Sequence, residues 1–268
     1  MSPIYVPGKV TLRQTWQPMD PDAAAYITAV ETADGQALEE KVKIAIDNFV
    51  LGCKADGIWN AIKASCILAG ARTLAGALVP LVKQPADSAP TRFGTEGGWN
   101  YNRETGLQGN GTDNYINSGR NNNADPQNSN HNAVYVKTAA SSTSAYMGVS
   151  ASTTGSGVNN FGVAGTIFAR QRNTTGISNL GSANAVGLLA TNRSSPSFYV
   201  LRAEKQSKTV SQVSQIPFSE DLSVFASGLG GFPTDARIAF YSIGEFLDLA
   251  LLDARVTDLI NAIGVAIP

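Results

Sequence analysis

Apolar residues follow helical spacing in the first part of the chain and form shorter, strand-like runs in the rest. Asp20 before Pro21 is typical of a helix start, and the apolar face that follows ends at Asp34-Gly35. Similar patterns predict a second helix over residues 38–50 and a shorter third helix over residues 58–67. Residues 69–82 contain two glycines and a proline, which leaves a frayed helix and an apolar strand as alternatives.

Beyond residue 95 the chain alternates between short β-rich pieces and polar turns. Asn110-Gly111 fits a type I′ turn and predicts a hairpin between the residues before it and Tyr115-Ile116. The predicted strands are residues 114–117, 132–137, 145–150, 160–168, 185–191, 197–203, 208–213, 222–226 and 237–243. Strands of this length and spacing predict two packed antiparallel sheets.

Residues 247–263 are predicted to form a closing helix. Its apolar seam, with spacings of three and four residues, consists of Leu249, Leu252, Val256, Leu259 and Ile263. Two interpretations stay open: the seam packs against its own sandwich, or it is an assembly surface where copies of the chain meet at a symmetry axis.

The predicted fold class is therefore α+β, with a helical segment, an antiparallel β-sandwich of the jelly-roll type and a C-terminal helix. The predicted divisions are an N-terminal arm (1–19), a helical assembly region (20–84), a linker (85–95) and the sandwich with its closing helix (96–268). Within the arm, residues 4–16 look like a strand, which could pair within its own subunit or reach into a neighbour.

Composition narrows the function classes. The 268 residues carry a net charge of −1 and only 15 % charged side chains, without a basic run, so binding to nucleic acid is not expected. There is no signal-peptide pattern and no apolar run of 18 residues, so we expect synthesis in the cytoplasm and no membrane insertion. Cys53 and Cys66 lie outside any metal-binding motif and are predicted to be buried free thiols.

Catalytic and metal-binding constellations are weak. The single histidine, His131, lies in a polar stretch and is predicted to be at the surface or a strand edge, so a serine triad is not expected. Glu204 has no acidic residue two positions away, and Glu220-Asp221 would point to opposite faces of a strand, so the paired carboxylates of a glycosidase are also missing. Asp125, among the asparagines of residues 119–130, leaves a calcium ion open, although one carboxylate is weak for that task and a solvated turn is the alternative. We predict a protein that is not an enzyme.

Sugar binding needs an aromatic ring beside planar amide or guanidinium groups. Side chains of these types gather on both sides of the predicted hairpin. The candidate ligand-binding residues are Trp99, Tyr101, Arg103, Tyr115, Arg120 and Asn132.

Two stretches carry a resemblance to a known family. Residues 107–116, LQGNGTDNYI, resemble the early hairpin of the concanavalin A-like, laminin-G-like jelly roll, and residues 236–247, ARIAFYSIGEFL, resemble its last strand and following helix. The resemblance implies a sandwich over about residues 95–264 of a kind that often binds glycans, sometimes through calcium.

The helical lead joined to such a sandwich is similar to structural proteins encoded by tailed bacteriophages and related prophages. This resemblance rests on residues 22–30, 33–35 and 57–66. It implies a non-enzymatic virion protein of the head surface or tail, with other virion proteins as partners, a homo-oligomeric state such as a trimer, and a displayed sandwich. A glycan-binding module for host attachment and, less favoured, a polysaccharide-cleaving enzyme are the alternatives.

Overall fold

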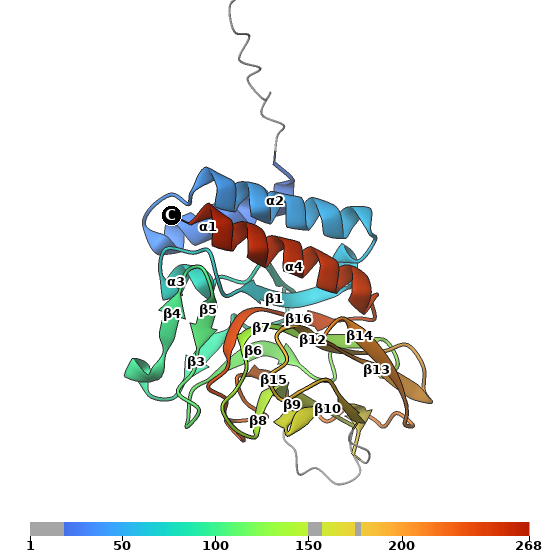
Figure 1. Ribbon diagram of the computed structural model, residues 1–268. Helices are drawn as coiled ribbons and strands as arrows, with labels where there is room; N and C mark the ends of the chain where they lie inside the picture. The colour runs from blue at the N-terminus through green and yellow to red at the C-terminus, as the bar shows by residue number, and fades with distance from the viewer. Residues whose placement is uncertain (1–18, 150–156, 175–177, 268) are drawn as a thin grey trace, which may run out of the picture.

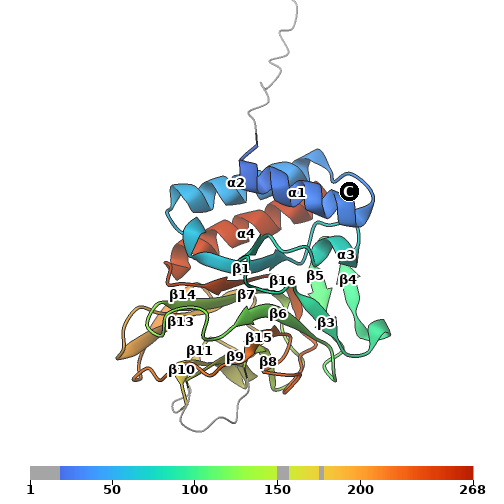
Figure 2. The same ribbon diagram turned by 180° about the vertical axis from the view of Figure 1, so that it is seen from behind.

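The computed structural model describes residues 19–149, 157–174 and 178–267 and arranges them in three layers (Figure 1). A layer of helices lies over one β-sheet, and this sheet packs face to face on a second one (Figure 2). The predicted N-terminal strand, residues 4–16, lies outside the described residues. The predicted α+β sandwich with leading helices and a closing helix is confirmed.

The three predicted long helices form, and the first of them begins and ends at the signals in the sequence. They are α1 (Pro21–Asp34), α2 (Glu40–Ala55) and α4 (Leu249–Ala266), and one turn, α3 (Leu74–Ala77), accompanies them. The Asp20 side chain accepts a hydrogen bond from the Asp22 N–H, and Gly35 ends α1 with a φ of 68°. No helix among the described residues is both long and apolar enough to cross a membrane.

The predicted third helix, residues 58–67, is wrong. A single 3₁₀ turn, η1 (Trp59–Ala61), leads into strand β1 (Ile62–Ile67), which pairs antiparallel with β16 (Arg237–Gly244). Five of the six side chains of β1 are buried, so both of its faces are covered and the alternation typical of a strand is absent. Within the ambiguous residues 69–82, the structure forms α3 and the first residue of a short strand, β2 (Val82–Lys83), beside β1.

The nine-stranded sheet contains the order β14-β13-β12-β7-β16-β1-β2, and β5 joins β4 to β16. Its remaining strands are β4 (Asn100–Asn102), β5 (Gly106–Gln108), β7 (Asn130–Thr138), β12 (Gly187–Arg193), β13 (Phe198–Ala203) and β14 (Gln206–Ser211). The sheet therefore includes β1 and β2, which precede the predicted linker at residues 85–95.

The seven-stranded sheet has the order β11-β10-β9-β8-β15-β6-β3. Its strands are β3 (Thr91–Phe93), β6 (Tyr115–Asn121), β8 (Ser144–Gly148), β9 (Val158–Ala164), β10 (Thr166–Asn173), β11 (Ser178–Leu180) and β15 (Asp221–Val224), and a second 3₁₀ turn, η2 (Glu96–Gly98), follows β3. Residues 160–168 are not the single strand expected, because Gly165 turns the chain between β9 and β10 with a φ of 74°.

The predicted Asn110-Gly111 hairpin is also wrong. The strands on either side of it, β5 and β6, lie in different sheets. Asn110 has no positive φ, and its side-chain oxygen accepts from the backbone N–H groups of Thr112, Asp113 and Asn114. The segment is therefore an Asx-type crossover between the sheets, not a type I′ turn.

Two apolar cores hold the layers together, one between the helices and the nine-stranded sheet and one between the two sheets. In the first core, the rings of Phe49 on α2 and Phe240 on β16 meet edge to face at 5.7 Å. The five residues proposed for assembly, Leu249, Leu252, Val256, Leu259 and Ile263, are at most 3 % exposed in this core. The seam of α4 thus packs within its own chain, and the alternative of a free self-associating seam is corrected.

Buried polar groups complete the interior. Cys53 and Cys66 are free and buried as predicted, and burial raises the pKa of each thiol to about 12. The expectation of a surface His131 is wrong, because this side chain is fully buried under the helical layer. Its Nδ1 lies 2.6 Å from the Glu245 carbonyl oxygen and its Nε2 lies 2.7 Å from the Ser242 hydroxyl, so both ring nitrogens are satisfied.

Candidate functional site

Three of the six predicted ligand-binding residues contribute to packing around β4. Trp99 is partly buried, with its ring edge to face against Phe225 at 5.4 Å. Tyr101 donates its hydroxyl to the Ala71 carbonyl at 2.8 Å, and burial raises the pKa of this phenol. Arg103 donates to Glu39 at 2.6 Å and so ties β4 to the start of α2.

The other three predicted residues also have internal partners. Tyr115 stacks on Phe93 at 4.9 Å. Asn132 is buried between the sheets and donates to Gln171 at 3.0 Å. Arg120 is buried and bridges Asp125 and Asp87.

The loop around Asp125, for which the sequence left a calcium ion and a solvated turn as alternatives, is held by an ion pair instead. The Asp125 carboxylate accepts two hydrogen bonds from Arg120, at 2.5 and 3.0 Å. No group of three or more His, Cys, Asp or Glu side chains suited to a metal ion occurs among the residues that the structure describes. Calcium binding stays an expectation from the resemblance.

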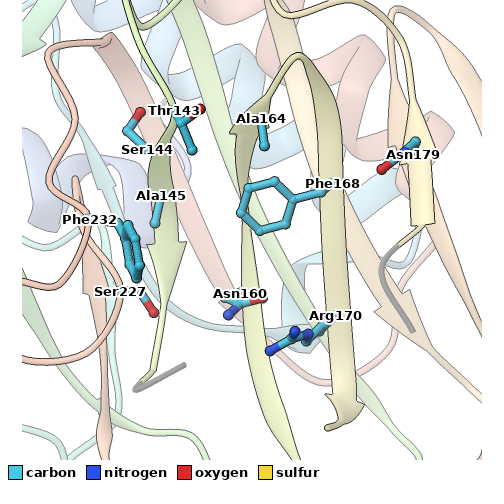
Figure 3. Close-up of a pocket in the computed structure, with 10 residues that line it drawn as sticks. All are labelled: Thr143, Ser144, Ala145, Asn160, Ala164, Phe168, Arg170, Asn179, Ser227 and Phe232. Carbon is cyan, nitrogen blue, oxygen red and sulfur yellow. The ribbon is translucent and has the colours of Figure 1, made fainter. Parts of the chain in front are cut away.

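A trough of about 460 Å³ lies on the outer face of the seven-stranded sheet, away from the helices (Figure 3). Alternation along the strands puts its residues there, because Phe161, Val163, Ile167 and Ala169 point into the core between them. The residues that line the trough are Thr143, Ser144, Ala145, Asn160, Ala164, Phe168, Arg170, Asn179, Ser227 and Phe232. None of the six predicted ligand-binding residues is among them.

Strand register explains why the face is hollow. Ala145, Gly162, Phe168 and Asn179 are successive partners across β8, β9, β10 and β11. Four strands at the usual spacing span about 14 Å. A methyl group and a bare glycine therefore lie beside a large phenyl ring, and this difference in side-chain size opens the trough. Gly162 is required, since an added Cβ would lie 2.1 Å from the Ser144 carbonyl oxygen.

Phe232 forms the opposite wall (Figure 3). Its ring is 62 % exposed, and its backbone has a φ of 51°, a left-handed conformation that bulky residues rarely adopt. The Phe232 carbonyl accepts from the Ala145 N–H at 2.8 Å, and the loop before it is closed by two hydrogen bonds between Ser227 and Gly231. The backbone thus holds an apolar ring in solvent at the edge of the sheet.

Polar groups without partners lie at one end of the trough (Figure 3). Asn160 is only 5 % exposed, and its side-chain oxygen accepts no hydrogen bond. Arg170, its direct cross-strand partner, has a buried Nε–H that finds no acceptor. A buried polar atom without a partner costs about 1–3 kcal/mol, so a ligand toward which Asn160 and Arg170 turn, with a donor for the amide oxygen and an acceptor for the guanidinium group, would recover that free energy.

The sequence contained a partial signal for this site. Along β9 and β10, Asn160, Ala164, Phe168 and Arg170 lie opposite the core positions, so an aromatic ring falls on the polar face of a hairpin. The turn at Gly165 had to be recognised before this alternation became visible. Phe232 had no such signal, because its exposure depends on the path of a loop.

Comparisons with known proteins concern the fold. No family model and no curated protein matches the sequence. Among solved structures, the binding domain of botulinum neurotoxin serotype D has a TM-score of 0.49 at 10 % identity, over 77 % of this chain, which spans about half (52 %) of that one. Domain 4 of AbnA, an extracellular arabinanase from Geobacillus stearothermophilus in complex with arabinotriose, has a TM-score of 0.40 at 13 % identity, over 65 % of this chain and 89 % of that one. The CBM40 of a Ruminococcus gnavus IT-sialidase, bound to alpha2,3 sialyllactose, has a TM-score of 0.33 at 13 % identity, over 52 % of this chain and 83 % of that one. At these identities, no site residue is transferred from any of them.

Proposed function

We propose that this chain is a glycan-binding protein and that the trough on the seven-stranded sheet is its binding site. The observation that carries the proposal is the combination of two phenyl rings, Phe168 and Phe232, with the unpartnered oxygen of Asn160 in one hollow. Exposing an apolar ring to water is unfavourable, so a ligand that covers the two rings gains binding free energy from the hydrophobic effect.

A sugar matches these groups in both respects. The C–H face of a pyranose can cover a phenyl ring, while its hydroxyl groups donate to an amide oxygen and accept from a guanidinium group. Because the trough lies on an uncovered sheet face, it suits a chain of sugar units better than a small molecule enclosed on all sides.

The test is to replace Phe232 by Ala and measure binding to a broad glycan array, followed by calorimetry with the best ligand. We expect wild-type protein to bind and Phe232→Ala to lose about tenfold or more in affinity, since an aromatic anchor contributes on the order of 2 kcal/mol. Phe246→Ala is the matched control, because Phe246 is 42 % exposed but does not line the trough.

Both variants change an exposed ring, so both should keep the wild-type unfolding midpoint within the range usual for surface positions. Absence of binding across the whole array, or equal binding by Phe232→Ala and wild type, would contradict the proposed site.

We further propose that binding is not followed by catalysis. Among the described residues that line the trough there is no carboxylate, whereas glycoside hydrolysis ordinarily uses two. His131 is buried under the helices between two partners and is not available as a general base. Release of reducing ends from a bound polysaccharide would overturn this part of the proposal.

For the biological setting we propose a virion component of a tailed phage or prophage, acting with other virion proteins and as a homo-oligomer, with a trimer as the expected state. Its support is the resemblance of the helical lead and sandwich to such proteins, together with the low proportion of charged residues. The open sheet face would then meet a host-surface glycan. Light scattering gives the mass of the protein in solution, and mass spectrometry of purified phage particles tests whether the chain is part of them. A protein that is monomeric in solution and absent from the particles would count against this setting.

A further inference from the structure

We propose that the trough selects acidic glycans, and that Arg170 is the residue that recognises the acidic group. This inference rests on the proposed glycan-binding function and specifies its ligand. Arg170 is the only charged side chain among the described residues that line the trough. A guanidinium group with an unsatisfied N–H in a partly apolar hollow favours an anionic acceptor over a neutral one.

The surroundings of Arg170 do not neutralise it. No salt bridge of the described residues includes Arg170. Glu204, near the β11 side, accepts instead from the hydroxyl and the backbone N–H of Ser182. Lys208 donates to the carbonyl of Asn179, a trough residue, at 3.0 Å. One cation and one anion therefore lie near the β11 edge and offset each other, so the preference for negative charge rests on Arg170.

The pairing of Arg170 with Asn160 specifies the ligand further. Cross-strand partners have Cβ atoms about 5 Å apart, so one sugar unit can reach both side chains. Arg170 offers a donor and Asn160 offers an acceptor, so the matching sugar presents an anionic oxygen beside a hydroxyl group. A carboxylate, as in a uronic or sialic acid, and a sulfate ester both supply such an oxygen.

The experiment compares neutral, carboxylated and sulfated forms of the same oligosaccharides by calorimetry, with wild type, Arg170→Gln, Arg170→Lys and the control Lys41→Gln. Lys41 is exposed on α2 and loses the same charge far from the trough. We expect wild type to bind at least one acidic series about tenfold more tightly than its neutral counterpart. The Arg170→Gln variant should lose this difference in affinity, and the Lys41→Gln variant should keep it. Arg170→Lys should keep part of the affinity but lose the two-point contact of the planar group.

The outcomes separate the two proposals. If wild type binds neutral and acidic forms equally, or if Arg170→Gln binds acidic forms as wild type does, the preference for acid is overturned while glycan binding stands. If wild type binds none of the forms, the glycan-binding function itself fails. The carboxylated and sulfated series distinguish the two sources of the anionic group.

Discussion

The outer faces of the two sheets carry different side chains, because helices cover only one of them (Figure 1). On the covered face, side chains such as Tyr135, Ala190 and Phe240 join the helices in one apolar core. On the open face, small and polar residues surround two phenyl rings. The side chains of the covered face stabilise the fold and are closed to a ligand. The open face keeps phenyl rings in contact with water, although their exposure does not stabilise the fold.

The difference between the two faces indicates where a ligand can bind in this sandwich. The predicted site residues are consumed by internal contacts, as Tyr101 and Arg120 show. The trough residues differ because Asn160, Arg170 and Phe232 have side-chain groups that the fold leaves unused. Polar atoms without partners also occur inside the molecule, as at the Oδ1 atom of Asn132, so the open face is distinguished by having such atoms beside two phenyl rings in one hollow.

The largest expected effect comes from placing the same charge on the two faces. Ala190 on β12 is fully buried under the helices, whereas Ala164 on β9 is exposed at the trough. Ala190→Asp buries a carboxylate without a partner and should lower the free energy of unfolding by more than about 4 kcal/mol, or prevent folding. Ala164→Asp should change it by less than about 0.5 kcal/mol.

Urea unfolding followed by circular dichroism measures both variants. Equal losses in the two variants would mean that the open face is covered in the folded protein, for instance by another copy of the chain, and the comparison of the two faces would no longer hold.

The second prediction concerns pH and the one histidine of the covered face. Burial lowers the pKa of His131 to about 4, with Arg120 acting in the same direction, against the hydrogen bond to Glu245 and the charge of Asp125. Because the native pKa lies below the unfolded value of about 6.5, the neutral ring stabilises the fold above pH 6.5, and this stability is lost as the pH falls toward 4. The expected loss from His131 is about 3 kcal/mol.

Urea unfolding at several pH values, for wild type and His131→Gln, isolates this contribution because the carboxylates are common to both. The wild-type free energy of unfolding should fall more steeply between pH 6.5 and 4. If His131→Gln does not fold, NMR titration of the single imidazole in wild type gives the same answer, and a pKa near 6.5 would refute the prediction.

How far the sequence leads depends on whether a signal is local. The helices α1, α2 and α4 follow from apolar spacing within one segment, and α1 and α4 also have a side-chain cap at their first turn. Strand β1 does not, since its burial on both faces comes from β16 and the helices, more than a hundred residues away for β16. His131 was misplaced for the same reason: its polar neighbours in sequence suggested solvent, but the helical layer covers its face of β7.

The candidate site depends even more on distant contacts. The pairing of Asn160 with Arg170 requires the exact register of β9 on β10, because one residue of slip in either strand would turn that strand's side chain into the core. The opposite wall requires the hydrogen bond between Ala145 and Phe232. The sequence around Asn110 has a clear turn signal, which is why the predicted binding residues lie on both sides of it. The Asn110 side chain, however, stabilises the crossover between the sheets.

The smallest expected effect tests whether the trough wall is held under strain. Phe232 has a φ of 51°, which Asn tolerates and Ala does not. Phe232→Asn should therefore be more stable than Phe232→Ala by about 1 kcal/mol, while both lose glycan binding. At Leu229, which is exposed in the same loop without a positive φ, the corresponding Asn and Ala variants should differ by less than about 0.5 kcal/mol. Urea unfolding gives all four values. An equal difference at the two positions would show that Phe232 carries no backbone strain. A difference confined to position 232 would mean that the fold loses stability by keeping a phenyl ring on its open face. A binding wall explains such a loss, whereas a purely structural loop does not.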